Sequence, residues 1–243
     1  MTVTGIIPAR YSSTRLPGKP LVLIHGKPMI QRVYEQSKKS KLLNRVIVAT
    51  DDQRIFDFVS SFGGEVMMTS DKHISGTDRL AEAVKMINCD IVVNVQGDEP
   101  FIDPNNIDIA IEPLLKDRML NVSTLAFKIT NPLDLENENK VKVVLDKNNF
   151  ALYFSRNYIP FDMEHNPARV WTLKDRKFYK HIGLYVYRKS FLIRFSKMKK
   201  SYLEEVEKLE QLRILENGER IKVVITKKDS VSIDTAEDIE LIG

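Results

Sequence analysis

Apolar runs rich in β-branched residues alternate with amphipathic helical patterns over the first half of the chain. Each run ends in polar or turn-forming residues, as strands do, and the runs are Val3–Ile7, Arg45–Ala49, Glu65–Met68 and Ile91–Val95. The segments between them that have helical periodicity are Pro28–Lys39, Asp52–Ser61 and Thr77–Met86. This alternation predicts an α/β fold of right-handed βαβ units, with a Rossmann-like, mainly parallel sheet and helices on both faces.

The pattern changes in the second half, where strand-like segments follow one another without a long helix. These segments are Val122–Lys128, Lys140–Leu145, Ala151–Phe154 and His181–Tyr187. The first long helix after them is predicted at Tyr202–Glu216, and Met163–Lys174 is the clearest loop. We therefore expect a mixed or antiparallel extension of the sheet.

Length and composition indicate one globular domain and exclude several classes of protein. The chain has 243 residues, of which 43% are hydrophobic and 29% charged, with one cysteine and a net charge of +4. No window approaches the roughly 18 apolar residues of a membrane span, which predicts a cytoplasmic protein without membrane contact. Cys89 alone cannot form an internal disulfide or a Cys-rich zinc site, and it is expected to be buried. The basic residues are interspersed with acids, so no stripe for nucleic acid is predicted.

The first candidate motif is Pro8–Pro20 (PARYSSTRLPGKP), directly after the first predicted strand. The carboxyl edge of a parallel sheet is where open α/β folds bind ligands. Arg10, Arg15 and Lys19 bring three cations and several hydroxyls into one turn-rich loop, which suits a triphosphate and a departing pyrophosphate. The alternative is a solvated basic loop.

Two further motifs place carboxylates at the ends of predicted strands. In Asn94–Pro100 (NVQGDEP) an apolar strand leads into Asp98, the candidate magnesium ligand, with an Asx-type turn that only ends the strand as the alternative. In Ser232–Asp238 (SIDTAED), Asp234 is a candidate second metal ligand. By itself, an Asp before Thr-x-Glu favours a helix cap.

These three motifs belong to a longer series of segments that resembles the CMP-Kdo synthetases, the 3-deoxy-manno-octulosonate cytidylyltransferase family. The resemblance extends in order along almost the whole chain and covers Arg10–Leu21, Asn94–Phe101, Ile233–Ile239, Thr69–Arg79 (TSDKHISGTDR), Ala151–Pro160 (ALYFSRNYIP), Lys180–Tyr187 (KHIGLYVY) and Leu203–Leu215 (LEEVEKLEQLRIL). Two departures are SIDTAED, where the family more often has GVDTPED, and a weak match between Pro160 and Phe178.

The resemblance implies a nucleotide-diphospho-sugar transferase fold and a single domain over residues 1–243. Residues 1–121 and 218–243 would form the nucleotide-binding core, and residues 122–217 the acceptor-sugar and dimerisation extension of a homodimer. The implied reaction transfers CMP from CTP to the anomeric hydroxyl of 3-deoxy-D-manno-octulosonate (Kdo) and releases pyrophosphate, for lipopolysaccharide synthesis. The implied cofactor is Mg²⁺.

The resemblance also implies two sets of binding residues. The CTP-binding positions would be Arg10, Ser13, Arg15, Lys19, Ser75, Gly76, Thr77, Asp78, Arg79 and Gln96. The segment Ser75–Arg79 also has the composition of a helix N-cap, and both interpretations can hold together. Catalysis would fall to Lys19, Arg15 and the metal pair Asp98 and Asp234.

For the acceptor, the matching positions are Arg156, His181, Tyr185, Glu210 and Gln211. One guanidinium and several hydrogen-bonding groups complement a carboxylate with many hydroxyls. Spacing alone predicts an apolar stripe of Leu203, Val206, Leu209 and Leu212, with Glu207, Glu210 and Gln211 on a solvated face. His181 in a strand is by default a structural histidine.

The hypothesis is in-line attack of the sugar hydroxyl on the α-phosphorus of CTP, with no covalent enzyme intermediate. The weakly matching loop keeps 8-amino-Kdo open as the acceptor, with a sialic acid as a weaker alternative. An alternative of another class is a non-catalytic homologue that binds CTP as a sensor or scaffold.

Overall fold

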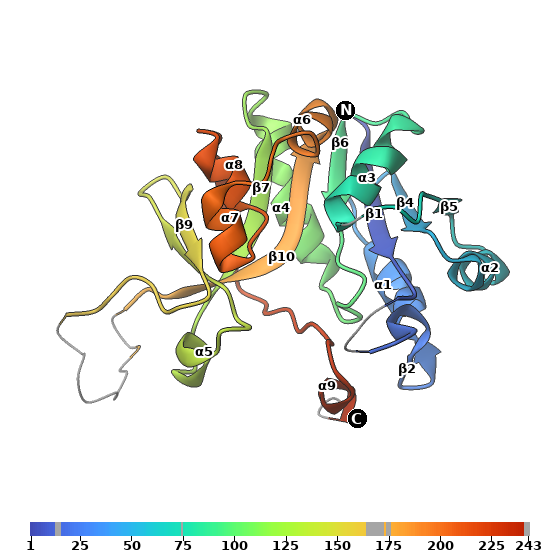
Figure 1. Cartoon of the computed structure of the whole chain (residues 1–243), viewed down its shortest axis with the longest axis horizontal. Coiled ribbons are helices and arrows are strands. Elements are labelled where there is room, and N and C mark those ends of the chain that lie inside the picture. Colours follow the sequence, from blue (N-terminus) through green and yellow to red (C-terminus); the bar gives the residue numbers. More distant parts are fainter. Residues whose placement is uncertain (13–15, 74, 164–172, 174–175, 241–243) are drawn as a thin grey trace.

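The computed structural model describes residues 1–12, 16–73, 75–163, 173 and 176–240. One sheet of nine strands dominates it, with the order β11-β7-β10-β6-β1-β4-β5, with β8 paired to β10 and β9 paired to β8 (Figure 1). The strands are β1 (Val3–Ala9), β4 (Arg45–Thr50), β5 (Val66–Met68), β6 (Ile91–Asn94), β7 (Val122–Lys128), β8 (Lys142–Leu145), β9 (Ala151–Ser155), β10 (Tyr179–Arg188) and β11 (Ile221–Thr226). A separate hairpin joins β2 (Leu23–Ile24) to β3 (Lys27–Pro28).

The predicted mixture of parallel and antiparallel pairing is confirmed. Strand β1 pairs in parallel with β4 and β6, β4 with β5, and β11 with β7. Strand β10 runs antiparallel to β6 and β7, and β8 runs antiparallel to β9 and β10. Because β7 and β10 lie between β6 and β11, the sheet is continuous from the first half of the chain into the extension. The assignment of nucleotide and acceptor roles to residue ranges stays a prediction.

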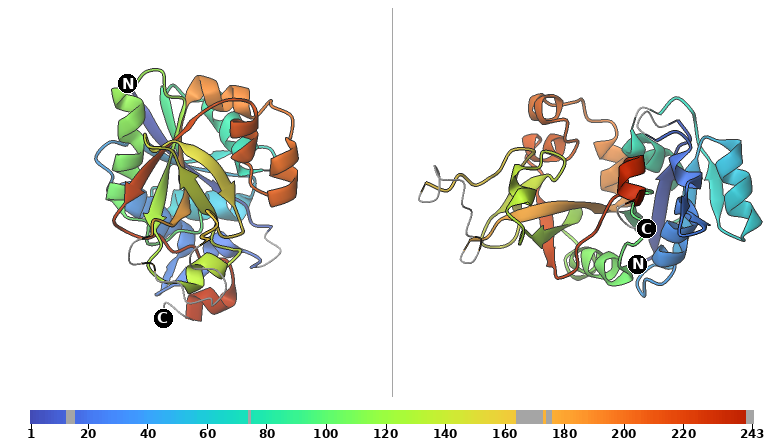
Figure 2. Two further views of the ribbon diagram at one scale, coloured as in Figure 1. Left: turned by 90° about the vertical axis from the view of Figure 1, so that its left-hand side faces the viewer. Right: turned by 90° about the horizontal axis from the view of Figure 1, so that it is seen from below.

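Helices cover both faces of this sheet, as the alternation predicted. The helices are α1 (Met29–Ser37), α2 (Gln53–Ser61), α3 (Gly76–Lys85), α4 (Pro104–Lys116), α5 (Leu133–Glu136), α6 (Lys189–Phe195), α7 (Tyr202–Glu207), α8 (Leu212–Glu216) and α9 (Ala236–Glu240), with a 3₁₀ turn, η1, at Lys19–Leu21. The apolar residues of α1, α2 and α4 pack in one core layer, and those of α3, α6 and α8 pack in the other (Figure 2). None of the described helices combines the length and apolar character of a membrane span.

The prediction of a single helix at Tyr202–Glu216 is wrong. The segment forms two short helices, because Lys208 adopts a left-handed conformation with φ 56° and ends α7. The turn buries Leu209, whereas Val206 of the expected apolar stripe is exposed. Helices α4 and α6 were not predicted, and Pro28 is the residue before α1 and not part of its first turn. Most of the predicted loop Met163–Lys174 lies outside the described residues.

Candidate active site

The cationic loop after β1 folds back on itself, so that its last cation lies against the sheet. The Gly18 N–H donates to the Tyr11 carbonyl at 3.0 Å. Gly18 has φ 69°, and a Cβ there would meet the Tyr11 ring at 3.1 Å, so glycine permits both the turn and the close contact. Lys19 follows and begins η1. Ser13 and Arg15 lie outside the described residues.

Two carboxylates from distant parts of the chain converge on Lys19. The Lys19 Nζ lies 2.7 Å from Asp98 Oδ2 and 2.8 Å from Asp234 Oδ1. The side chains of both acids retain about 30% exposure, at 28% and 32%, so they face an open site and not the core. The structure therefore brings the two predicted metal ligands together beside the loop cation.

The last segment of the chain reaches this site through an apolar anchor. Ile233 is fully buried against Ile24 and Met29, and its N–H donates to the Asp98 carbonyl at 2.9 Å. The helix cap belongs to the next residue, because Thr235 and Asp238 exchange hydrogen bonds at the start of α9. The Asp234 side chain thus contacts Lys19. It does not take the helix-capping role that the local sequence favoured for it. In the view from below, α9 lies beside the first strands (Figure 2).

The turn that follows β6 lies close to β1 and forms one side of the site. A Cβ on Gly97 would lie 3.0 Å from the Pro8 carbonyl oxygen, which makes glycine necessary at this point. The neighbouring Gln96 donates from Nε2 to the Gly183 carbonyl at 2.9 Å. The turn therefore holds Gln96 toward β10 and Asp98 toward Lys19.

These elements surround a cavity of about 310 Å³ that contains most of the predicted CTP-binding residues. Its lining residues are Pro8, Ala9, Arg10, Lys19, Pro20, His73, Ser75, Gly76, Arg79, Gln96, Gly97, Asp98 and Asp234. Cations, carboxylates and backbone edges lie together in it. This combination can hold a phosphorylated ligand and a metal ion.

The start of α3 contributes both a cap and a cavity wall. Ser75 caps the helix by accepting a hydrogen bond from the Asp78 N–H at 3.1 Å, so the capping interpretation is correct. Asp78 accepts in turn from the Ser75 hydroxyl and lines neither of the two cavities described here. Arg79 is buried and donates to Asp51 and to the Thr69 hydroxyl, so its guanidinium is held by the protein.

A second cavity of about 160 Å³ adjoins the first and contains predicted acceptor residues. It is lined by Pro8, Gly76, Thr77, Asn94, Gln96, Tyr185, Tyr187, Glu210 and Gln211. The Thr77 hydroxyl donates to Glu210, which joins α3 to the α7–α8 turn. Burial raises the pKa of Glu210, and the Thr77 hydrogen bond opposes that shift. Glu210 and Gln211, predicted as solvated by spacing alone, therefore face a partly enclosed space.

The other two predicted acceptor residues lie apart from these cavities. His181 Nε2 lies 3.0 Å from the Thr124 hydroxyl, and burial lowers the pKa of the imidazole to about 3, so the ring is neutral. Arg156 follows β9 and donates from Nε to the Glu207 carbonyl at 2.9 Å. Neither residue lines either cavity, as far as the described residues define them.

Three lining residues were not singled out by sequence reasoning. Asn94 and Tyr187 line the smaller cavity and His73 the larger one. Among the described residues, the buried Asn94 Oδ1 has no hydrogen-bond partner, which leaves an acceptor directed at a ligand or water. Asn94 is the polar end of an otherwise apolar strand, and that signal was available in the sequence.

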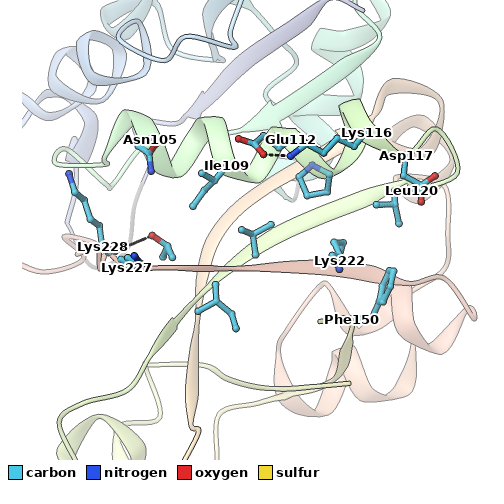
Figure 3. Close-up of a pocket in the computed structure, with 14 residues that line it drawn as sticks. Asn105, Ile109, Glu112, Lys116, Asp117, Leu120, Phe150, Lys222, Lys227 and Lys228 are labelled. Carbon is cyan, nitrogen blue, oxygen red and sulfur yellow. Dashed lines mark hydrogen bonds and ion pairs between the residues drawn. The ribbon is translucent and has the colours of Figure 1, made fainter. Parts of the chain in front are cut away.

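A larger cavity, of about 800 Å³, lies elsewhere, between α4 and β11 (Figure 3). Its apolar lining includes Ile109, Phe150 and Val224, and lysines lie around it. Two of those lysines, Lys116 and Lys228, already pair with acids. The cavity shares no lining residue with the two cavities at the carboxylate pair, so volume alone does not identify the site of chemistry.

Comparison with known proteins identifies the family. The cytidylyltransferase family model matches residues 4–221. The 3-deoxy-manno-octulosonate cytidylyltransferase of Geotalea daltonii is 52% identical over 245 residues, which cover 100% of this chain and 97% of that protein. The chain belongs to the 3-deoxy-manno-octulosonate cytidylyltransferase family. The family member from Thermodesulfovibrio yellowstonii is 51% identical, with 99% of this chain and 96% of that protein covered.

A solved structure agrees with this assignment to the cytidylyltransferases. CMP:2-keto-3-deoxy-manno-octonic acid synthetase complexed with CTP superposes with a TM-score of 0.92 at 38% sequence identity. The match covers 100% of this chain and 97% of the other. The α/β fold and the family resemblance expected from the sequence are confirmed, whereas the roles of individual site residues stay predictions.

Proposed function

We propose that this protein transfers CMP from CTP to the anomeric hydroxyl of Kdo, giving CMP-Kdo and pyrophosphate. The observation that carries the proposal is the match of the whole chain to enzymes named for this activity, at 52% identity over 245 residues. The two adjoining cavities support it, since the larger is lined partly by cationic side chains and the smaller by hydrogen-bonding groups. Adjoining donor and acceptor spaces suit a reaction that depends on positioning two substrates.

The carboxylate pair fits a magnesium ion. The Lys19 ammonium already lies between Asp98 and Asp234, so the two acids converge on a position that attracts positive charge. The described residues contain no group of three or more His, Cys, Asp or Glu suited to a metal. A pair is sufficient for Mg²⁺, which commonly completes its coordination with water and substrate phosphates. When bound, the ion would supply charge neutralisation at the reacting phosphate.

The chain's own residues have three tasks in this mechanism. Arg10 and Lys19 hold the phosphates and neutralise charge on the leaving pyrophosphate. Gln96 and the α3 start hold the cytidine side, and Tyr185, Glu210 and Gln211 orient the sugar. The sugar oxygen bonds to the α-phosphorus while that phosphorus releases the bridging oxygen. The electron pair leaves with pyrophosphate, and the hydroxyl proton passes to water.

The test is incubation of the protein with CTP, Mg²⁺ and Kdo, followed by mass spectrometry for CMP-Kdo and an assay for pyrophosphate. We expect both products in equal amounts and none in the presence of EDTA. Parallel reactions with 8-amino-Kdo and a sialic acid compare acceptors by kcat/KM. CTP binding without pyrophosphate release from any of these sugars would contradict the proposal and favour a non-catalytic CTP-binding protein.

We further propose that the protein works as a cytoplasmic homodimer. Exposed apolar side chains on the extension, among them Leu152 and Val206, support a subunit contact. Light scattering during gel filtration is expected to give twice the chain mass. A monomer at micromolar concentration with full activity would contradict the dimer.

A further inference from the structure

A buried asparagine joins the end of β11 to α4. Asn106, in the first turn of α4, is fully buried, and both sides of its amide are used. Its Oδ1 accepts from the Thr226 hydroxyl at 2.5 Å, and its Nδ2 donates to the Lys228 carbonyl at 3.1 Å. The Thr226 hydroxyl also accepts from the Lys228 N–H at 3.0 Å, which closes a turn directly after β11. Asn106 therefore fixes the direction in which the chain leaves β11.

The residues that follow this turn are held by two other parts of the sheet. Asp229 forms an ion pair at 2.6 Å with Lys180 of β10, which is itself buried. The Ser230 hydroxyl donates to Glu99 Oε2 at 2.6 Å, and Glu99 is only 5% exposed. Glu99 belongs to the turn after β6, directly next to Asp98 in the sequence. Consecutive residues of the returning chain are therefore fixed by β10 and by the turn that contains Asp98.

Together these contacts form an antiparallel seam between residues 98–106 and residues 226–234, which we call the returning segment. Residue numbers rise along one side of the seam as they fall along the other. Its last contact is the hydrogen bond from the Ile233 N–H to the Asp98 carbonyl, at 2.9 Å. Asp98 and Asp234 thus lie at the same end of the seam. The register of the seam therefore sets how these two carboxylates face each other.

The polar character of the seam is suited to fixing a position. Neither Asn106 nor Glu99 lines the two cavities of the site, as far as the described residues define them, so any contribution to the site is indirect. Buried hydrogen bonds add only modest net stability, but they match donors to acceptors in a single register. An apolar contact alone permits one segment to slide along the other. The hydrogen bonds of the seam therefore determine the alignment of the two segments.

We propose that Asn106 and Glu99 are positioning residues that hold the returning segment in the one register at which Asp234 meets Asp98. They thereby complete the site for a divalent cation. The inference rests on the proposed function, because it takes these two acids as ligands of Mg²⁺. Loss of a seam hydrogen bond makes local opening of the returning segment more frequent. An open segment leaves Asp98 without the second carboxylate, so the cation is bound more weakly.

The test removes two hydroxyls from the returning segment and leaves the residues of the site unchanged. Thr226→Val keeps the shape of the side chain and removes the hydrogen bond to Asn106, and Ser230→Ala removes the hydrogen bond to Glu99. Hydrogen–deuterium exchange of the full chain measures the local opening. We expect the Ile233 amide to exchange about fivefold faster in each single variant, the size of one hydrogen bond, and faster still in the double variant.

Cation binding is the second measurement, and it does not depend on turnover. Mn²⁺ serves as the probe, and its Kd is measured by electron paramagnetic resonance without CTP. We expect the Kd of the double variant to rise at least about threefold, because only the closed segment presents both acids. The Mg²⁺ concentration for half-maximal pyrophosphate release should rise with it, while kcat at saturating Mg²⁺ stays within about twofold of the wild type. General loosening of the fold would lower kcat at every Mg²⁺ concentration.

The matched control is Lys228→Met, in the same segment. The Lys228 ammonium pairs with Asp103, and its side chain is 66% exposed, so the substitution keeps the main-chain contact with Asn106. It is expected to leave the exchange of the Ile233 amide and the Kd for Mn²⁺ unchanged. Ser230→Thr keeps a hydroxyl and should also behave like the wild type. If circular dichroism shows that Thr226→Val does not fold, Ser230→Ala carries the test alone.

Two results overturn the inference while the proposed function stands. One is wild-type exchange of the Ile233 amide in the folded double variant. The other is faster exchange with an unchanged Kd for Mn²⁺, which would make the seam a structural contact only. A wild-type protein that does not bind Mn²⁺ removes the metal assignment and the inference with it. Absence of CMP-Kdo formation by a wild-type protein that does bind Mn²⁺ overturns the proposed transfer alone.

Discussion

At the scale of single residues, the site is organised by the charges around Lys19. An ammonium within 2.8 Å of two carboxylates offsets most of their mutual repulsion in the absence of a divalent ion. The same arrangement explains why two acids can converge in an open site. A magnesium ion between these acids would leave Lys19 available to the phosphates of CTP.

Replacement of Asp98 by asparagine is therefore expected to abolish turnover and preserve the fold. Asp98→Asn keeps the shape of the side chain but removes the charge that binds the cation, and kcat should fall at least about 100-fold. The measurement is magnesium-dependent pyrophosphate release, with a circular dichroism spectrum as the test of folding. Asp57→Asn, at an exposed acid of α2, is the control and should be as active as the wild type. Wild-type-like release by Asp98→Asn would refute the metal assignment.

His181 gives a prediction about stability and pH. Its pKa in the folded state is about 3, below the ordinary 6.5, so between these values the unfolded chain binds a proton that the folded chain does not. Stability is therefore lost as the pH falls from about 6.5 toward 3, with a slope of about 1.4 kcal/mol per pH unit from this group. Urea unfolding at pH 7 and pH 5 should show a larger loss for the wild type than for His181→Gln. Equal losses would show that the imidazole is not buried in its neutral form.

At the scale of elements, the α7–α8 pair depends on one buried ion pair. Arg213 donates from Nε to Glu204 at 2.6 Å and from Nη2 to its second oxygen, and both side chains are less than a tenth exposed. Glu204 also accepts from the Ser201 N–H in a capping box that begins α7. The pair thus joins the start of one short helix to the next and holds the turn that presents Glu210.

Breaking this pair on one side should be strongly destabilising. Arg213→Met leaves the Glu204 carboxylate buried without its partner, which is expected to lower the free energy of unfolding by about 3–5 kcal/mol. The double variant Arg213→Met, Glu204→Met should lose less, because no unpaired charge remains. Arg194→Met removes an exposed pair with Glu219 and should cost at most about 1 kcal/mol. Urea denaturation measures all three, and a loss for Arg213→Met no larger than that for Arg194→Met would disprove the argument.

The same two helices show why periodicity predicted some elements and not others. Strong patterns in β1, β4, α2 and α3 sit between clear turn signals, and the structure agrees with them to within a few residues. The segment around Lys208 continues the helical pattern through a residue that folds with positive φ. The break is decided by the burial of Leu209 and by the contacts of Glu207 and Glu210 with other elements, which no local pattern contains.

At the scale of the whole molecule, the site depends on the return of the chain to its first strands. The segment after β11 brings Ile233 into contact with Ile24 and Met29, and this contact carries Asp234 to Asp98. Helix α9 has no fully buried residue in its described span, and its Ile239 packs, partly buried, against the same cluster. The position of Asp234, a proposed metal ligand, thus depends on this small apolar cluster.

Ile233→Ala should therefore reduce activity more than global stability. The lost methyl groups weaken the anchor by about 2–4 kcal/mol, enough to detach the segment locally while the sheet stays folded. We expect kcat to fall at least about tenfold and the thermal unfolding midpoint to fall by only a few degrees. Val231→Ala, at an exposed residue of the same segment, is the control. A full loss of folding in Ile233→Ala, or full activity, would contradict this account.

By itself, the sequence determined the α/β class, the motifs that follow predicted strands, and the family. Periodicity, turn residues and long family-distinctive segments are local properties of the chain. The tertiary structure alone decided that Asp98 and Asp234 meet at Lys19, that Thr235 rather than Asp234 caps α9, and that Glu210 faces a cavity. It also revealed the buried Asn106, since burial depends on neighbours far away in the chain. Contacts between distant segments form only when the strands assemble into the sheet and the helices pack on its faces. The spacing of residues along the chain does not encode them.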